Sequence, residues 1–304
     1  MFVLAIYKKN INLMYRIYLS FFLSFFFFSI SFSQNEYEYV GGVKLSDSII
    51  ISYKIKFKET RGEVKGYSIT DIGGEHETRS NVFGEYDVDN KILSFRETGI
   101  VYTKSPISQN DFCFLNTTIE NFVFGKTKKV KADFIGLFSD NTECINGEIL
   151  LNTLEKAEER AKKIVEKINK SKRVPDSLKQ KLREVNLMDN FKMNMLKKDQ
   201  TLSVFTNSNT IKINIYDGGK EDGDKITILV NNEIVLNTYE ANKLKKFIDI
   251  NLENSKTSIV IKANNEGGIS PNTVVVEIDD GINLIKALSN LKKNETTQID
   301  FLKH

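Results

Sequence analysis

Cysteine and histidine are scarce in this chain of 304 residues, which has two of each and no tryptophan. A catalytic thiol needs a basic partner, and only His76 and His304 are present as imidazoles. The sequence also lacks a Gly-x-Ser-x-Gly elbow, a P-loop and a Cys-x-x-Cys pair. These absences argue against an enzyme, and we expect the chain to have no catalytic activity.

The first 33 residues have the layout of a secretion signal. Lys8, Lys9 and Arg16 precede an apolar run from Leu19 to Phe32, and Ser31 and Ser33 form a small-x-small pattern before Gln34. The run is shorter than the roughly 20 residues of a membrane-spanning helix. We therefore predict that residues 1–33 are a cleaved signal peptide, which starts at Met1 or Met14. The alternatives are an uncleaved anchor or a buried helix.

Positive charge is not in excess once this segment is set aside. Residues 1–33 hold three of the 43 basic residues and no acidic one, which leaves 40 basic against 40 acidic residues. Domains that bind nucleic acid are usually strongly basic. We therefore expect no nucleic-acid partner and, after signal cleavage, no stable membrane span.

Export bears on the two cysteines, Cys113 and Cys144. Cysteines of an exported chain most often pair, because disulfides persist in oxidising compartments. We predict a Cys113–Cys144 disulfide that ties Cys113 to the loop entering the last strand of its domain.

Strand patterns follow one another from 37 to 151. Ile51, Tyr53, Ile55 and Phe57 alternate with polar residues, and Arg61-Gly62 is a turn. Further strands are predicted over 64–69, 82–88, 92–97, 112–115, 119–124, 130–138 and 147–151. Short strands with tight turns are typical of an antiparallel up-and-down barrel.

The pattern becomes helical over 152–198. Asn152 with Glu155 suggests an N-cap with a capping box. Apolar residues then recur at helical spacing, and Pro175 begins a second helical segment carrying Leu178, Leu182 and Val185. We interpret this as a helical linker. Its apolar stripe either binds a partner or, as we favour, packs on its own barrel or the next domain; the stripe is Leu154, Ala157, Ala161, Ile164, Val165 and Ile168.

Strand patterns return over 202–302. Isoleucines and valines alternate or cluster over 211–215, 226–236, 247–250, 258–261 and 274–278, and a last strand is expected over 298–302. This segment is predicted to be a smaller antiparallel β-sandwich. The fold class is therefore all-β with a helical linker, a barrel followed by a sandwich.

Two modules of known type resemble these halves. The segments 216–224, 230–233, 265–273 and 280–281 look like a β-sandwich module common in secreted proteins of Bacteroidetes. Gly66, Gly84, Glu97, Cys113 and the stretch Cys144–Leu151 resemble an exported lipocalin-like barrel of the same bacteria. The resemblance implies no activity. The chain departs from a classical lipocalin because it has no Gly-x-Trp.

Four carboxylates fall within eight residues in the acidic loop, at Asp217, Glu221, Asp222 and Asp224, and Gly218, Gly219 and Gly223 lie among them. Calcium takes six to eight oxygen ligands, which such a loop could supply. The spacing is not that of an EF-hand. The alternative is a solvated turn in which the aspartates cap backbone N–H groups. Glu277, Asp279 and Asp280 would join the site if the end strand pairs there.

Two other acidic positions carry weaker hypotheses. Glu97 suggests an acid/base inside the barrel or half of a buried ion pair. Glu75, His76 and Glu77 are adjacent rather than spaced for a metal, so a polar loop is favoured there.

Taken together, the sequence predicts an exported, non-catalytic binding or scaffolding protein of the bacterial envelope, periplasmic or on the cell surface. Its partner would be an envelope protein or a glycan, and its one possible cofactor is calcium. The alternative function is a carrier that holds a small apolar ligand inside the barrel.

Overall fold

The computed structural model describes residues 36–45, 49–106, 111–171, 174–175 and 193–303. From residue 36 onward the chain forms one compact unit. The predicted signal peptide and the second helical segment over 176–192 lie outside the described residues, so both stay predictions.

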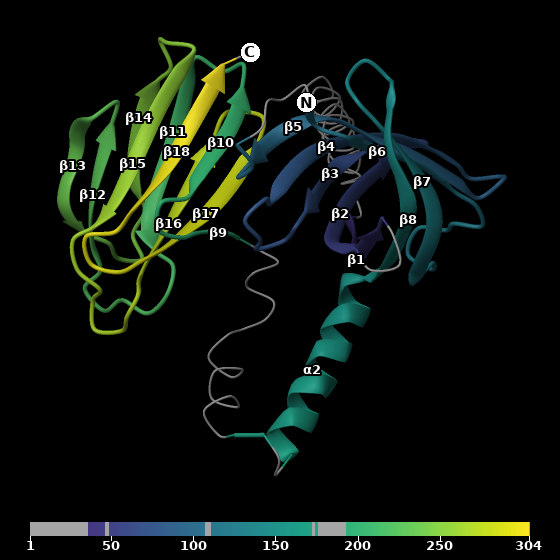
Figure 1. Cartoon of the computed structure of the whole chain (residues 1–304), viewed down its shortest axis with the longest axis horizontal. Coiled ribbons are helices and arrows are strands. Elements are labelled where there is room, and N and C mark those ends of the chain that lie inside the picture. Colours follow the sequence, from purple (N-terminus) through teal and green to yellow (C-terminus); the bar gives the residue numbers. More distant parts are fainter. Residues whose placement is uncertain (1–35, 46–48, 107–110, 172–173, 176–192, 304) are drawn as a thin grey trace, which may run out of the picture. The chain divides into compact units, whose positions relative to one another are not determined.

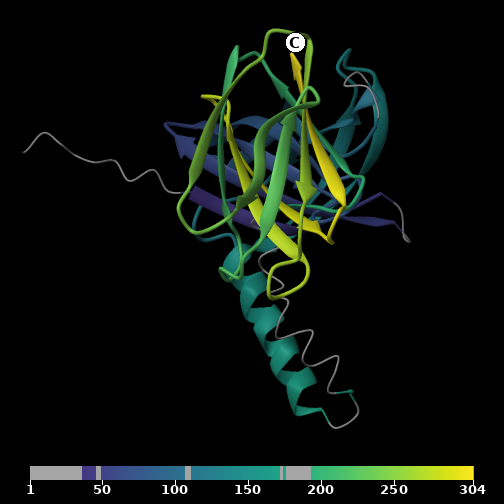
Figure 2. The same cartoon turned by 90° about the vertical axis from the view of Figure 1, so that its left-hand side faces the viewer.

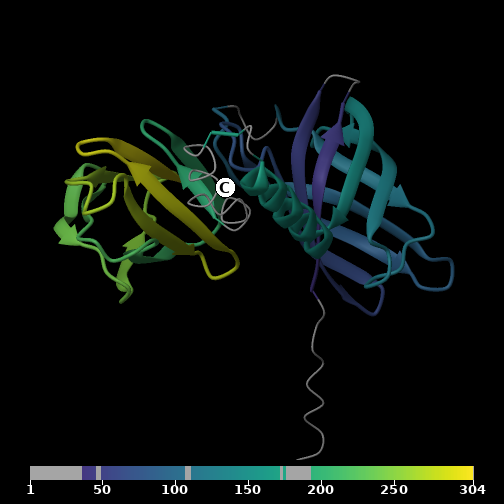
Figure 3. The same cartoon turned by 90° about the horizontal axis from the view of Figure 1, so that it is seen from below.

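Eight antiparallel strands form the predicted barrel (Figure 1; Figure 3 gives a second view). Strands that are consecutive in the chain pair with each other, and β1 pairs with β8 to close the ring. The strands are β1 (Glu36–Lys44), β2 (Ile50–Thr60), β3 (Glu63–Thr70), β4 (Thr78–Asp87), β5 (Ile92–Thr103), β6 (Phe114–Ile119), β7 (Lys129–Leu137) and β8 (Glu143–Thr153).

Aromatic and aliphatic side chains fill the barrel because the strand alternation points them to one face. Tyr53, Ile55 and Phe57 of β2 are all buried. The predicted strand over 119–124 is wrong beyond Ile119, where β6 ends and a turn begins. The rings of Phe122 and Phe124 in this connection lie 4.9 Å apart and pack against the same core.

The Cys113–Cys144 disulfide is confirmed, with an S–S distance of 1.95 Å. Cys113 directly precedes β6, whereas Cys144 is the second residue of β8 and not part of a loop. The bridge crosses Gly136 of the intervening strand β7. A Cβ atom at Gly136 would lie 2.4 Å from the sulfur of Cys113, so only glycine leaves room for the bridge.

The predicted helix is present as α2 (Leu154–Lys170), but it begins one residue later than expected. Thr153 is the N-cap and makes no side-chain capping bond. Asn152 belongs to β8, so the capping box predicted there does not form. No residue of α2 is buried, and Ile164 is 56% exposed. The other stripe residues are half-buried and α2 contacts β1 and β8, so the helix touches the barrel without fully burying any residue of the stripe.

Ten strands form the predicted sandwich, in two layers around one apolar core (Figure 2). One layer has the order β14-β11-β16-β17-β9 and the other β13-β12-β15-β18-β10. The strands are β9 (Asn194–Leu196), β10 (Thr201–Thr206), β11 (Thr210–Asp217), β12 (Lys225–Val230), β13 (Glu233–Glu240), β14 (Lys246–Asn251), β15 (Lys256–Ala263), β16 (Asn272–Asp279), β17 (Leu284–Leu291) and β18 (Thr296–Lys303).

Four features of the sandwich differ from the prediction. Strand β9 falls inside the range 152–198 that was predicted as the helical linker, so the sandwich begins at Asn194 and not at residue 202. The pairs β10–β18 and β9–β17 are parallel, so the module is not purely antiparallel. Strand β17 was not predicted, although Ile285, Ala287 and Leu291 alternate along it and are buried. Finally, β10 pairs with the end of β5, which makes the barrel sheet and one sandwich layer a continuous 13-stranded sheet.

Candidate metal centre

Carboxylates replace the apolar core residues at one end of the sandwich. Ile211, Ile213 and Ile215 of β11 point into the core, and Asp217 is the next residue on that face. Asp224 occupies the equivalent place in front of β12, two residues before the buried Ile226. The strand alternation therefore turns both aspartates inward, and each is 1% exposed.

Asp222, in the connection between β11 and β12, completes the group. One carboxylate oxygen from each of Asp217, Asp222 and Asp224 lies within 4.8 Å of the other two. Like charges this close in a partly buried site repel one another, and burial removes the water that would screen them. Such a group is costly unless a cation or protons neutralise it.

Each of the three carboxylates is held by one backbone N–H group. Gly219 donates to Oδ1 of Asp217 at 2.7 Å. Ile269 donates to Oδ2 of Asp222 at 2.6 Å, and Thr273 donates to Oδ2 of Asp224 at 2.7 Å. Each bond engages one of the two oxygens of its carboxylate and restrains the orientation of the side chain. The carboxylates are thus oriented by the backbone rather than free to rotate.

The second oxygen has no such partner in the two buried aspartates. Oδ2 of Asp217 and Oδ1 of Asp224 are buried and accept no hydrogen bond from the described residues. A buried polar atom without a partner costs about 1–3 kcal/mol and calls for a specific explanation. A bound cation is the ligand that both oxygens would suit.

Asn272 adds a third orphaned oxygen of the same kind. It is fully buried at the start of β16, and its amide nitrogen donates to the carbonyls of Lys225 and Asn265, at 3.2 Å each. Its Oδ1 has no partner in the described part of the chain. Because Val274 is paired with Asp217, Asn272 is two residues from that register position and on the same face of the sheet.

One cation lies beside the group. The ammonium of Lys243 is 3.8 Å from Oδ1 of Asp217 and donates to the main-chain carbonyls of Asp217 and Gly219. It is half-exposed. A single ammonium does not balance three carboxylates. Burial raises the pKa of Asp224 to about 6, and the negative charges of Asp222 and Asp217 act in the same direction. The hydrogen bond from Thr273 acts in the opposite direction and lowers this pKa.

The structure brings together three of the four predicted ligands. Glu221 instead accepts a hydrogen bond from the backbone N–H of Lys243 and is exposed. Asp279 pairs with Lys212, so the end of β16 that carries Asp279 and Asp280 lies away from Asp217. Glu277 bonds to Lys245, Asn214 and Lys286. Although burial works to raise its pKa, these contacts hold it at about 2.

The second connection of the site, between β15 and β16, was not predicted to take part. Asn265 bonds to the N–H of Lys225 and to the carbonyl of Gly223, which ties this connection to the acidic loop. Gly267 has a φ of +58°. A Cβ atom there would lie 2.5 Å from Oδ1 of Asp222 and 2.7 Å from Oδ1 of Asp224. Only the run of Asn and Gly over 265–272 hinted at such a turn.

The acidic residues of the two weaker hypotheses, Glu97 and Glu77, have hydrogen-bond or charged partners other than a metal. Glu97 accepts bonds from the hydroxyls of Tyr53 and Ser68 and from the N–H of Leu115, and burial raises its pKa. Within the described ranges, it is therefore not half of an ion pair with lysine or arginine. Glu77 is buried and lies 3.8 Å from the ammonium of Lys104. Among the described residues, Asp217, Asp222 and Asp224 are the one carboxylate, histidine or cysteine group placed to hold a metal.

Comparison with known protein families, curated proteins and solved structures finds no match to this chain. Within the described ranges, no helix has both the length and the apolar character needed to cross a membrane.

Proposed function

We propose that the chain is an exported, non-catalytic binding or scaffolding protein whose sandwich module binds a calcium ion. The observation that carries the calcium assignment is the pair of buried carboxylate oxygens of Asp217 and Asp224, which are oriented but have no partner. Metal binding would supply both with a partner and would neutralise the repulsion between the three carboxylates.

The ligand chemistry favours calcium over other metals. All candidate ligands are oxygens, which suits hard cations, whereas zinc and copper prefer sites with nitrogen or sulfur. Magnesium requires near-ideal octahedral geometry and releases its water reluctantly. Calcium accepts irregular sets of carboxylate and carbonyl oxygens from separate loops. Asp217, Asp222, Asp224 and Asn272 would hold it, and the ion would join the end of β11 and the β11–β12 connection to the start of β16.

Two features fit an extracytoplasmic setting. The Cys113–Cys144 disulfide is of a kind that persists in oxidising compartments. Calcium sites of extracellular modules are often weak, with Kd values of about 0.1–1 mM, because calcium is abundant outside cells. A site with one counter-charge already in place, from Lys243, suits this range. Export and the envelope location remain part of the proposal.

The test is thermal unfolding of the chain without residues 1–33, in millimolar calcium and in EDTA. A ligand that binds only the folded state raises Tm, with a stabilisation of about 2.7 kcal/mol when its concentration is 100 times Kd. We expect calcium to raise Tm and magnesium to have a smaller effect. An equal Tm in calcium and EDTA would refute the calcium assignment.

A pair of variants separates the site from general acidity. Asp224→Asn keeps the side-chain shape and removes one buried charge, so it should abolish the calcium effect and raise Tm in EDTA. Asp249→Asn removes an exposed charge from β14 and serves as the matched control; it should keep the full calcium response. A calcium response that survives in Asp224→Asn would contradict the assigned ligands.

The alternative function, a carrier with an apolar ligand inside the barrel, gains no support from the barrel core. Tyr39, Phe57, Phe95 and Phe122 are buried there and pack on one another. These packed rings occupy the space that an apolar ligand would need.

A further inference from the structure

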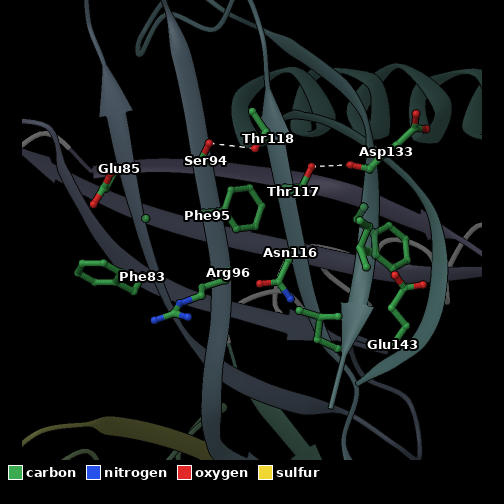
Figure 4. Close-up of a pocket in the computed structure, with 14 residues that line it drawn as sticks. Phe83, Glu85, Ser94, Phe95, Arg96, Asn116, Thr117, Thr118, Asp133 and Glu143 are labelled. Atoms are coloured by element: carbon green, nitrogen blue, oxygen red, sulfur yellow. Dashed lines mark hydrogen bonds between the residues drawn. The ribbon is translucent and has the colours of Figure 1, made fainter. Parts of the chain in front are cut away.

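A groove of about 750 Å³ crosses the outer wall of the barrel over β4, β5, β6 and β7 (Figure 4). The inward neighbours along these strands are buried: Val82, Phe95 and Phe134 belong to the barrel core, and Thr117 is a buried polar residue. The side chains between them therefore point outward into the groove. The groove is separate from the carboxylate site, which belongs to the sandwich.

Strand register arranges the outward side chains in two parallel rows, which we call the wall rows. In the first, Phe83 pairs with Arg96, Arg96 with Asn116, and Asn116 with Ile135. In the second, Glu85 pairs with Ser94 and Ser94 with Thr118, and Asp133 is the next groove residue on β7. With strands about 4.8 Å apart, a row of four residues spans about 14 Å.

The first wall row combines flat polar groups with apolar ends. Arg96 is exposed, and Asn116 donates its Nδ2 to the carbonyl of Phe114 at 3.0 Å, which leaves Oδ1 as an acceptor facing the groove. Phe83 is half-buried and Ile135 is 48% exposed at the two ends. This row offers hydrogen-bond donors, an acceptor and two apolar surfaces.

The second wall row places a carboxylate at each end of a hydroxyl pair. Ser94 and Thr118 share a hydrogen bond of 2.9 Å (Figure 4). Glu85 and Asp133 are both exposed. Their oxygens accept hydrogen bonds, and charged acceptors form the stronger ones.

This chemistry discriminates between ligand classes. Three carboxylates line the groove, those of Glu85, Asp133 and Glu143, and they oppose an anionic ligand, whereas the guanidinium of Arg96 between them opposes a polycation. Five charged or hydroxyl groups in the wall rows make the groove unsuitable for a lipid chain; they are Glu85, Ser94, Arg96, Thr118 and Asp133. A peptide strand would need an open sheet edge, whereas the segments under the wall rows pair with neighbours on both sides. A neutral ligand with many hydroxyls and apolar C–H faces meets every feature.

We propose that the wall rows bind a neutral oligosaccharide that lies across β4–β7. The sugar hydroxyls would donate to Glu85 and Asp133 and accept from Arg96, and C–H faces would pack on Phe83 and Ile135. This assignment rests on the binding role proposed above, for which it names the chemical class of the partner. It does not depend on the calcium ion.

The experiment is isothermal titration of the disulfide-bonded chain with a panel of neutral hexasaccharides: β-1,4-glucan, β-1,3-glucan, α-1,4-glucan and β-1,4-mannan. At least one should bind saturably. Because hydrogen bonds that involve a charged group contribute most, Arg96→Ala should weaken binding by about tenfold or more. Asn116→Ala should weaken it in the same direction.

Lys58→Ala is the matched control, since Lys58 is an exposed barrel cation on β2 that does not line the groove. This variant should bind the sugar with the affinity of the wild type, and EDTA should not change the affinity of either protein for the sugar. Thermal unfolding of each variant checks that the barrel is intact.

Three outcomes would overturn the inference: no saturable binding of any panel member, binding that both groove variants leave unchanged, or saturable binding of hexalysine in place of the sugars. A chain that binds no sugar but melts higher in calcium would overturn this inference alone, and the calcium proposal would stand.

Discussion

Asp224 shows how a single side chain links the fold to the proposed ion. Its position in front of β12 is one at which the strand alternation calls for an apolar residue, and the flanking core residue Ile226 is buried. A carboxylate there is stable only with compensation. In the absence of a metal, a proton can supply that compensation only below about pH 6, because the pKa of Asp224 is raised to about 6.

This raised pKa predicts an unusual pH dependence for the calcium-free protein. The ordinary value for aspartate is 3.8, so between pH 4 and pH 6 the folded state binds a proton that the unfolded state has lost. Stability should therefore fall as pH rises through this window, by about 3 kcal/mol for a shift of two pKa units.

Urea unfolding in EDTA at a series of pH values measures the effect, and subtracting the same series for Asp224→Asn isolates Asp224 from other buried acids. In calcium the sign should reverse, since the ion binds the ionised form. A difference curve that is flat from pH 4 to pH 6 would show that Asp224 keeps its ordinary pKa.

Gly267 gives a second prediction at the same scale. A side chain there would press on the oxygens of Asp222 and Asp224, in addition to straining a backbone with φ of +58°. Gly267→Ala should therefore destabilise the fold by roughly 1–2 kcal/mol and abolish the rise of Tm in calcium.

Gly281→Ala is the control for Gly267→Ala. Gly281 has a φ of +86°, but a Cβ atom there meets nothing within 4 Å. The backbone cost should be similar, while the calcium response remains. If both variants keep the response, the two carboxylate oxygens near Gly267 do not form the site.

At the scale of elements, local patterns were predictable and distant pairings were not. The alternation of Tyr53, Ile55 and Phe57 identified β2, because period-two burial is a local property. The parallel pair β10–β18 joins segments almost a hundred residues apart, and nothing local marks it. Strand β17 begins after Asp280-Gly281 with an exposed Leu284, which obscured its alternation.

The same distinction applies to the metal centre. The acidic loop is one continuous stretch, so its carboxylates were recognisable as possible ligands. The N–H groups of Ile269 and Thr273 that orient Asp222 and Asp224 come from the β15–β16 connection and the start of β16, about 50 residues later. Their contribution depends on the pairing of β11 with β16, which only the folded structure provides.

At the scale of elements, the testable prediction concerns the stability that the Cys113–Cys144 disulfide adds to the barrel. It closes a loop across 31 residues and links β6 to β8 over β7. In the chain-entropy model a loop of this length contributes about 3–4 kcal/mol. The double variant Cys113→Ser with Cys144→Ser should lose about this much in urea unfolding.

Reduction of the wild type with dithiothreitol should reproduce the loss seen in the double variant and leave that variant unchanged. Equal stability of the wild type and the double variant would mean that the bridge adds nothing to the barrel.

At the scale of the whole molecule, the two modules share a sheet. Ser203 and Val204 of β10 pair with Thr103 and Tyr102 of β5, and Tyr102 belongs to the core of the sandwich. The ammonium of Lys104 donates to the carbonyl of Met195 at 2.8 Å. A division of function follows from the two proposals: the barrel wall contacts the partner, and the ion stabilises the sandwich.

The central claim is that one calcium ion binds at Asp217, Asp222 and Asp224. Isothermal titration calorimetry of the EDTA-stripped, disulfide-bonded chain with calcium tests it most directly, with Asp224→Asn titrated in parallel. We predict a single site per chain, with a Kd of about 0.1–1 mM as in extracellular modules, and no saturable heat for the variant. Saturable binding of the same strength in the variant, or none in the wild type, would contradict the account.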